Sequence, residues 1–357
     1  MSRRPRASAP GALGARLGRI PAELRDRVST GRVLRRRRPP EIEVGGPTGE
    51  PTIYYLCPDY AAPSGGIRVI YRHVDALNEA GRPAAVLHHA DGFRCDWFEN
   101  RTRVLGAPSV ELAVDDLLVV PEVYGPFLDR LPRGPRRVAF NQNGYLTFQH
   151  VREGRTPDYD GFEAAMTVSE DSAELLRFAF PGLRVEVVPN SIDPELFRAQ
   201  AQTPGRRLAL MPRKRPQDAE MILRLLGDRL AGWEVTPIEG VGEQETAAML
   251  RSAPVFLALG FHEGFGLPAA EAMASGCFVV GFPGFGGREV FDPRFSTAVE
   301  DGDVLGAAKA LAAACARFES EPEALRADGA RAAAAIRERY SRAQQVESLL
   351  AFFDRLG

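Results

Sequence analysis

Two glutamates, Glu263 and Glu271, lie in the stretch of sequence with the clearest chemical content, residues 261–282. Carboxylates are useful beside a phosphate site only when hydroxyl groups donate to them, and a sugar linked to a nucleotide offers two such sets. We expect Glu271 to accept from a ribose diol and Glu263 from a sugar hydroxyl. Taken singly, each fits an ordinary polar role, since a helix dipole alone favours an acid such as Glu271 in its first turn.

The sequence around the glutamates predicts a binding site for an anion at the start of a short helix. Pro268 lies where this helix would begin and Gly276 lies just past its end, which are the preferred places for these residues. The free N–H groups of the first turn attract phosphate, and glycines let it approach the backbone closely. The residues expected at this site are Gly264, Phe265, Gly266 and Leu267.

A basic turn, residues 211–216, follows an apolar run in the second half of the chain. Arg213 and Lys214 would lie on a loop that faces the cleft, where each charge-assisted hydrogen bond to an anion contributes about 1.5–3 kcal/mol. Arg215 is equally placed by sequence, so the partner of Arg213 is left open between Lys214 and Arg215. The alternative is a solvated basic turn.

Short apolar runs alternate with helical patterns along residues 51–340, which predicts parallel sheets covered by helices. The runs read as strands are 52–58, 83–89, 116–121, 136–140, 164–169, 185–189, 206–212, 233–238, 254–259 and 277–282. The helical patterns are 67–80, 170–178, 217–230, 243–251, 268–275, 302–318, 322–339 and 342–356. We predict an α/β fold of two tandem, Rossmann-like, doubly wound domains, residues 51–190 and 191–340, with a cleft at the carboxyl ends of both sheets.

The spacing of Glu263 and Glu271 resembles the E-x(7)-E motif of family 4 glycosyltransferases, which have the GT-B fold. Residues 167–197 are similar to a segment of that family, and Pro189-Asn190-Ser191-Ile192-Asp193 matches its P-N-x-(V/I)-D element. Gly65 and Gly66 resemble its glycine loop. The resemblance covers about residues 50–356 and implies that residues 341–357 form a helix that packs back on the first domain.

The resemblance implies a transferase that moves a sugar from a nucleotide diphosphate sugar to an acceptor hydroxyl, with retention of configuration and without a metal or cofactor. The first domain would bind the acceptor and the second the donor. The implied catalytic residues are Glu263, Arg213 and Lys214. The implied donor contacts are Gly65, Gly66, Asn190, Gly264, Phe265, Gly266, Leu267 and Glu271.

Two features depart from the family. Its Arg and Lys are usually several residues apart, whereas Arg213 and Lys214 are adjacent. The family commonly has a histidine that contacts the donor sugar, and the comparable region here has amide side chains. These amides can hydrogen-bond to the sugar or the acceptor, but they do not titrate. These candidates are Asn141, Gln142 and Asn143. Glu122 also follows an apolar run, and whether it faces the cleft is left open, as is closure of the glycine-rich loop 281–291 over the donor.

Asp158-Tyr159-Asp160 reads as a D-x-D metal motif, but it follows no apolar strand and such triplets arise by chance among 47 acidic residues. We therefore expect no metal. The four cysteines are far apart and form no zinc-type pair.

The basic residues are concentrated at the N-terminus. Residues 1–40 contain twelve of them, all arginine, and two acids, which leaves 33 basic and 45 acidic residues in the rest. Residues 1–50 are expected to form a disordered tail, either simply solvated or drawn to anionic lipid. Nucleic-acid binding is not expected, because no aromatic residues alternate with the arginines. No signal peptide or apolar run of 18 residues is present, so the expected location is the cytoplasm, with peripheral membrane contact left open.

Rival functions are another GT-B enzyme, such as a sugar-nucleotide epimerase or a phosphorylase, and a non-catalytic scaffold that docks on membranes or polyanions. The base, the sugar, the linkage and the acceptor, whether carbohydrate, lipid-linked or small molecule, are not specified by the sequence, and neither is the oligomeric state.

Overall fold

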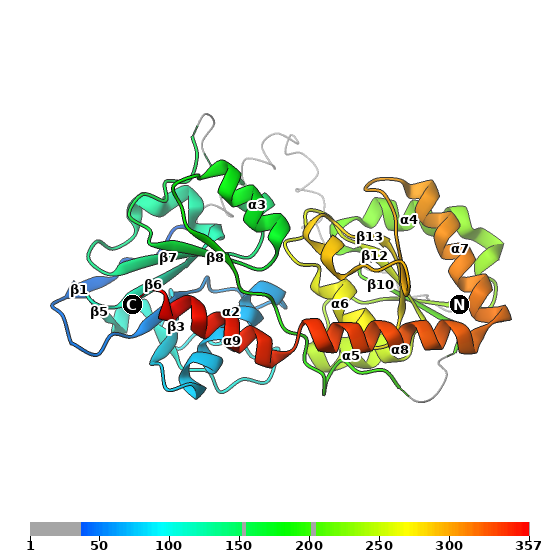
Figure 1. Ribbon diagram of the computed structural model, residues 1–357, viewed down its shortest axis with the longest axis horizontal. Coiled ribbons are helices and arrows are strands. Elements are labelled where there is room, and N and C mark those ends of the chain that lie inside the picture. The colour runs from blue at the N-terminus through cyan, green and yellow to red at the C-terminus, as the bar shows by residue number, and fades with distance from the viewer. Residues whose placement is uncertain (1–36, 152–154, 201–204, 357) are drawn as a thin grey trace, which may run out of the picture.

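The computed structural model describes residues 37–151, 155–200 and 205–356. They form two α/β domains that lie side by side (Figure 1). Each domain has one fully parallel main sheet with helices against it, so the predicted tandem doubly wound architecture is confirmed. No helix within the described ranges is long and apolar enough to cross a bilayer.

The main sheet of the first domain has the strand order β4-β3-β2-β6-β7-β8-β9. Its strands are β2 (Ile53–Leu56), β3 (Ala84–His88), β4 (Val104–Gly106), β6 (Leu117–Pro121), β7 (Arg136–Asn141), β8 (Ala164–Thr167) and β9 (Val185–Val187). The strands β2, β3, β6 and β7 are rich in buried apolar residues, as a sheet covered on both faces requires. Helices α2 (Gly65–Glu79) and α3 (Glu170–Ala179) connect strands of this sheet.

The N-terminal boundary differs from the prediction. Residues 43–45 form strand β1 (Glu43–Gly45), which pairs in parallel with β5 (Glu111–Ala113), and Ile42 packs against the core of the first domain. The expected tail of residues 1–50 therefore extends too far, because this short segment has apolar side chains to bury. Residues 1–36, which hold ten of the twelve arginines of residues 1–40, lie outside the described residues.

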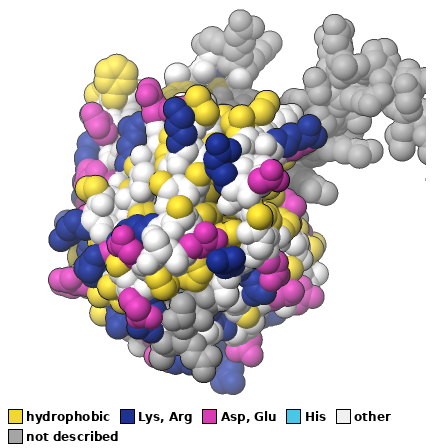
Figure 2. Space-filling view, turned by 90° about the vertical axis from the view of Figure 1, so that its right-hand side faces the viewer, with side chains coloured by type: hydrophobic (Ala, Val, Ile, Leu, Met, Phe, Trp, Pro, Cys, Tyr) yellow, Lys and Arg dark blue, Asp and Glu magenta, His cyan; other side chains and the backbone are white. Residues whose placement is uncertain are grey.

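The second domain contains a five-stranded sheet with the order β11-β10-β12-β13-β14. Its strands are β10 (Arg207–Leu210), β11 (Glu234–Pro237), β12 (Val255–Leu259), β13 (Phe278–Phe282) and β14 (Ser296–Ala298). Its helices are α4 (Pro216–Leu226), α5 (Glu243–Arg251), α6 (Leu267–Ala274), α7 (Val304–Ser320) and α8 (Pro322–Arg339). The face of this domain in Figure 2 carries basic and acidic side chains interspersed, not a field of one sign.

The chain crosses between the domains twice. The first crossing follows β9, and the second joins α8 to α9 (Arg342–Asp354), which lies against α2 of the first domain (Figure 1). The two crossings are hydrogen-bonded to each other, because the Ile192 N–H donates to the Tyr340 carbonyl at 2.9 Å. The expected return of the last helix to the first domain is thus present, and its buried Phe352 belongs to a hydrophobic core that continues through both domains.

Candidate active site

Helix α6 follows strand β12 of the second domain, after a loop. Gly266 precedes the helix with φ +86°, a conformation that glycine adopts readily, and Pro268 occupies the second helical position. Glu271 is consequently the fifth residue of α6. The prediction that it lies in the first turn is wrong, because the helix starts at Leu267 and places the carboxylate one turn further from the free N–H groups.

The start of α6 faces the start of α2 across the domain boundary. A β-carbon added to Gly65, the first residue of α2, would lie 2.8 Å from Leu267 Cδ1. A β-carbon on Gly264 would collide with the backbone carbonyl of Gln142. Two helix N-termini and their glycines are thereby brought together from the two domains. Gly65, Gly66 and the loop 264–267 are the residues predicted to contact the donor.

Lys214 and Glu263 meet at this junction. The Lys214 ammonium lies 2.7 Å from Glu263 Oε1, and the Glu263 side chain is only 14% exposed. Arg213 is exposed on the preceding turn, the 3-10 segment Pro212–Lys214 that follows β10. The predicted catalytic residues therefore cluster at the carboxyl end of β10 and β12.

Arg215 has a different environment from its two basic neighbours. Its guanidinium donates to the Gly260 carbonyl at 2.9 Å and to Asp218 at 2.8 Å, and it also pairs with Asp301. It lies 4.8 Å from the ring centre of Phe261 and 4.9 Å from that of Phe282. These contacts hold Arg215 in a structural role, so Lys214 is the neighbour of Arg213 that contacts a predicted catalytic residue.

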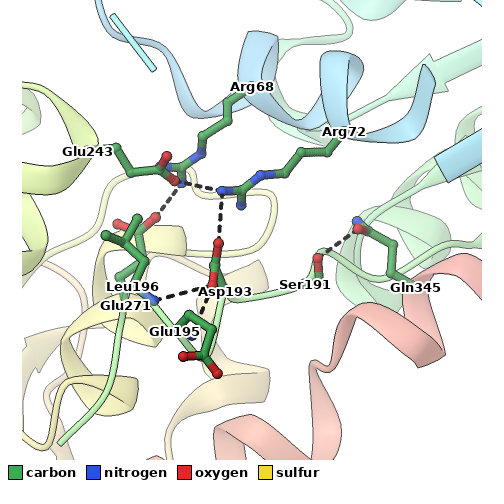
Figure 3. Close-up of polar contacts among 9 residues, drawn as sticks. All are labelled: Arg68, Arg72, Ser191, Asp193, Glu195, Leu196, Glu243, Glu271 and Gln345. Atoms are coloured by element: carbon green, nitrogen blue, oxygen red, sulfur yellow. Dashed lines mark hydrogen bonds and ion pairs between the residues drawn. The ribbon is translucent and has the colours of Figure 1, made fainter. Parts of the chain in front are cut away.

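Glu271 is buried at the domain interface and contacts Arg68 of α2 (Figure 3). Arg68 Nη1 also lies 2.7 Å from Glu243 Oε1, and Arg72 Nη2 lies 2.8 Å from the same oxygen. Arg72 also reaches Asp193 in the first crossing, at 3.9 Å. Burial raises the pKa of the Glu271 carboxyl, and the Arg68 guanidinium opposes that rise.

The glycine-rich loop after β13 packs backbone to backbone against the glutamate loop. The Glu263 N–H donates to the Gly284 carbonyl at 2.6 Å, and the Gly286 N–H donates to the Glu263 carbonyl at 3.0 Å. A β-carbon on Gly286 would collide with the Gly264 carbonyl. This loop therefore fixes the position of Glu263 in the described structure.

The three amides after β7 have separate contacts. Asn141 is buried and donates to Thr147 Oγ1 at 2.7 Å, which directs its amide into the first domain. The Gln142 side chain donates to the Gly66 carbonyl at 3.0 Å, and the Asn143 side chain donates to the His262 carbonyl at 2.5 Å. Gln142 and Asn143 thus lie at the junction, whereas Asn141 supports the strand end.

Asn190 and Glu122 are also buried polar residues, and Glu122 lies beside Gln142. The Asn190 side chain is 3% exposed, and its Oδ1 has no hydrogen-bond partner among the described residues. Glu122 accepts from the Gln142 N–H at 3.1 Å, and burial raises its pKa to about 7. Glu122 therefore supports the backbone of Gln142 from within the first domain.

The Asp158-Tyr159-Asp160 triplet forms a local turn, in which Asp158 Oδ1 accepts from the Asp160 N–H at 3.0 Å. Within the described ranges, no group of three or more His, Cys, Asp or Glu side chains is arranged to hold a metal ion. The four cysteines are free and buried.

Sequence reasoning missed two groups at the junction. Arg68 and Arg72 are four residues apart on α2, a spacing that places them on one helix face and would have marked a basic stripe after the glycine loop. The second group is a stack of Tyr145, His262 and Phe285, with ring centres 4.8 to 5.6 Å apart. Its members come from three distant segments, so no local pattern reveals it.

Comparison with known proteins agrees with this geometry. Residues 220–335 match the family of glycosyl transferases group 1. An alpha-1,6-glucosyltransferase of Actinobacillus pleuropneumoniae serotype 7 (strain AP76) is 26% identical over 267 residues, which span 70% of this chain and 79% of the relative.

Solved structures share the fold. A sucrose-phosphate synthase from Thermosynechococcus elongatus matches 86% of this chain and 99% of its own, with a TM-score of 0.65 and 15% identity. The Anabaena protein HepE in complex with UDP-glucose matches 85% of this chain and 99% of its own, with a TM-score of 0.61 and 12% identity.

The two tandem domains and the junction between them define a protein of the GT-B fold. The match of residues 220–335 to the group 1 glycosyl transferases agrees with the resemblance of the glutamate and glycine motifs.

Proposed function

We propose that this chain transfers a hexose from a UDP-sugar to a hydroxyl of a carbohydrate acceptor, with retention of configuration and without a metal ion. The observation that carries this proposal is the ion pair of Lys214 with Glu263, which precedes α6, whose start lies against the start of α2. Arg213 lies on the same turn as Lys214. UDP-glucose in the similar HepE structure supports uracil as the base.

Negative charge grows on the diphosphate as the glycosidic bond breaks, and the junction supplies positive groups to meet it. Arg213 and Lys214 supply positive charge, and the N–H groups that begin α2 and α6 add partial positive charge. Preorganised donors at a developing charge contribute about 3–4 kcal/mol to transition-state stabilisation. This set of charges replaces the role that a divalent cation has in metal-dependent transferases.

The carboxylates and amides define the two sides of the diphosphate. Glu271 accepts from the ribose diol, while Glu263, held beside Lys214, accepts from the transferred sugar. Gln142 and Asn143 face the sugar and acceptor from the first domain as neutral hydrogen-bonding groups. The departing phosphate oxygen takes the proton of the acceptor hydroxyl on the same face of the sugar, so no enzyme carboxylate acts as a nucleophile.

Thermal-shift measurements with nucleoside diphosphates and sugar nucleotides, with and without EDTA, test the donor and the metal. We expect UDP and one UDP-sugar to raise the unfolding temperature equally in both conditions. Loss of the shift with EDTA would contradict metal independence, and a shift from another base alone would correct the donor.

Product analysis with the identified donor separates the rival functions. An epimerase converts the sugar nucleotide without an acceptor, a phosphorylase requires inorganic phosphate and no nucleotide, and a scaffold binds none of these ligands. We expect Arg213→Ala to lower kcat/KM about 30-fold, an effect of about 2 kcal/mol. Arg224→Ala is the matched control, because Arg224 lies exposed on α4 and pairs only with Glu220 in the described structure. Wild-type activity in the Arg213 variant would refute the assigned site.

A further inference from the structure

The ion cluster at the domain interface joins a residue of the first domain to the glutamate assigned to the ribose. Arg68 lies on α2 and Glu271 lies on α6, 203 positions apart in the sequence. Their side chains are 8% and 6% exposed. A carboxylate buried to this extent depends on a paired cation to stay charged and correctly oriented.

Arg68 is the cation that is placed to keep the Glu271 carboxylate charged and oriented. Its Nη2 contacts Glu271 Oε1, while its Nη1 contacts Glu243, so the guanidinium is held in two directions (Figure 3). A carboxylate has two oxygens and about four lone-pair directions, and the contact from Arg68 leaves capacity for hydroxyl donors.

Arg72 provides a contrast on the same helix. It contacts Glu243 and Asp193, and it makes no ion pair with Glu271 in the described residues. If Arg68 were lost, Glu243 would still contact Arg72, but Glu271 would have lost the cation that contacts it. The charged groups around Glu271 are then Arg72 from α2, Glu243 from α5 and Asp193 from the crossing.

We propose that Arg68 is the positioning residue for Glu271, holding its carboxylate in the orientation that binds the ribose diol of the nucleotide. Recognition of the nucleotide by the second domain then depends on a side chain of the first. This inference rests on the proposed donor site and adds a residue from the opposite domain to it.

Paired nucleotides that differ only at the 2′ position isolate the contact. Calorimetry with UDP and 2′-deoxy-UDP, and with the corresponding adenine, guanine and cytosine pairs, gives the ratio of the two dissociation constants between pH 6.5 and 8.5. In the wild-type chain we expect the ribose form to bind at least about tenfold more tightly at every pH, the effect of one charge-assisted hydrogen bond.

Arg68→Gln should reduce this ratio to about threefold or less at pH 6.5. The ratio should recover as the pH rises, because the unpaired buried carboxyl regains its charge only at higher pH. Arg68→Lys should keep most of the discrimination without a pH dependence, and Arg72→Gln should keep the wild-type ratio. Adding Arg68→Gln to Glu271→Gln should change the ratio no further.

Several outcomes separate this inference from the proposed function. An unchanged ratio in Arg68→Gln, or an equal loss in Arg72→Gln, would overturn the role of Arg68. If Arg68→Gln does not fold, a collapsed ratio in a folded Arg68→Lys chain would do the same. If the wild-type chain binds the ribose and 2′-deoxy forms equally well, the contact of Glu271 with the ribose is refuted, while the proposed transfer activity is not. If the chain binds no nucleotide at all, both the role of Arg68 and the proposed function are refuted.

Discussion

Replacing Glu122 with glutamine should make the stability of the first domain less sensitive to pH. Glu122 is 7% exposed, and burial raises its pKa from the ordinary 4.5 to about 7. Between these two pKa values the folded chain keeps a proton that the unfolded chain releases. The stability that protonated Glu122 contributes is therefore fully present below pH 4.5 and is lost as the pH rises to about 7. A shift of this size corresponds to about 3 kcal/mol.

The expected result is similar stability of Glu122→Gln and the wild-type chain at pH 5, and a gain of about 2–3 kcal/mol for the variant at pH 8. The glutamine carbonyl can still accept from the Gln142 N–H, so the fold keeps this contact. Urea unfolding followed by fluorescence measures the effect. Trp97 lies in the first domain and Trp233 in the second, so a Trp233→Phe background reports the first domain alone. An equal difference at pH 5 and pH 8 would refute the assignment of a protonated Glu122.

Four further substitutions test the junction and the core. Lys214→Ala should lower kcat/KM about 30-fold with little change in stability, whereas Arg215→Ala should lower the unfolding temperature by about 5 °C, because it removes partly buried hydrogen bonds; the reverse pattern would exchange their roles. Gly264→Ala should raise the donor KM about tenfold or more, because the added methyl group collides with the Gln142 carbonyl and separates the two loops; an unchanged KM would show that this contact is not needed. Phe352→Ala should destabilise the first domain by about 3–5 kcal/mol in the same fluorescence measurement, since its ring is fully buried; an unchanged first-domain transition would contradict the packing of α9.

The order of strands and helices was largely predictable, because their signals are local. Helix α2 was expected over residues 67–80 and is found over Gly65–Glu79, since its apolar face and the glycine after it mark both ends. The short strand β1 was missed because three residues in an arginine- and proline-rich region have too little apolar pattern. The turn of α6 that carries Glu271 was also misplaced, because proline fits the second helical position as well as the first.

The position of Lys214 and Glu263 at the strand ends was predictable from the sequence, but the contacts of the candidate residues were not. Adjacent basic residues are indistinguishable by sequence, yet a 3-10 turn rotates successive side chains by about a third of a circle and sends Lys214 and Arg215 to different partners. The contact between Arg68 and Glu271 depends on how two separate domains dock, and no spacing within either domain encodes it.

The return of α9 to the first domain has a consequence for how the protein is made. Residues 342–354 leave the ribosome only after the whole second domain, yet Leu349 and Phe352 complete a core that also contains Tyr55 and Val74. Until that helix emerges, the nascent first domain has part of its apolar surface uncovered. In this state it is prone to associate with chaperones or with other chains. Emergence of residues 342–354 from the ribosome, not synthesis of residues 51–190, is the event that lets this domain reach its final packing.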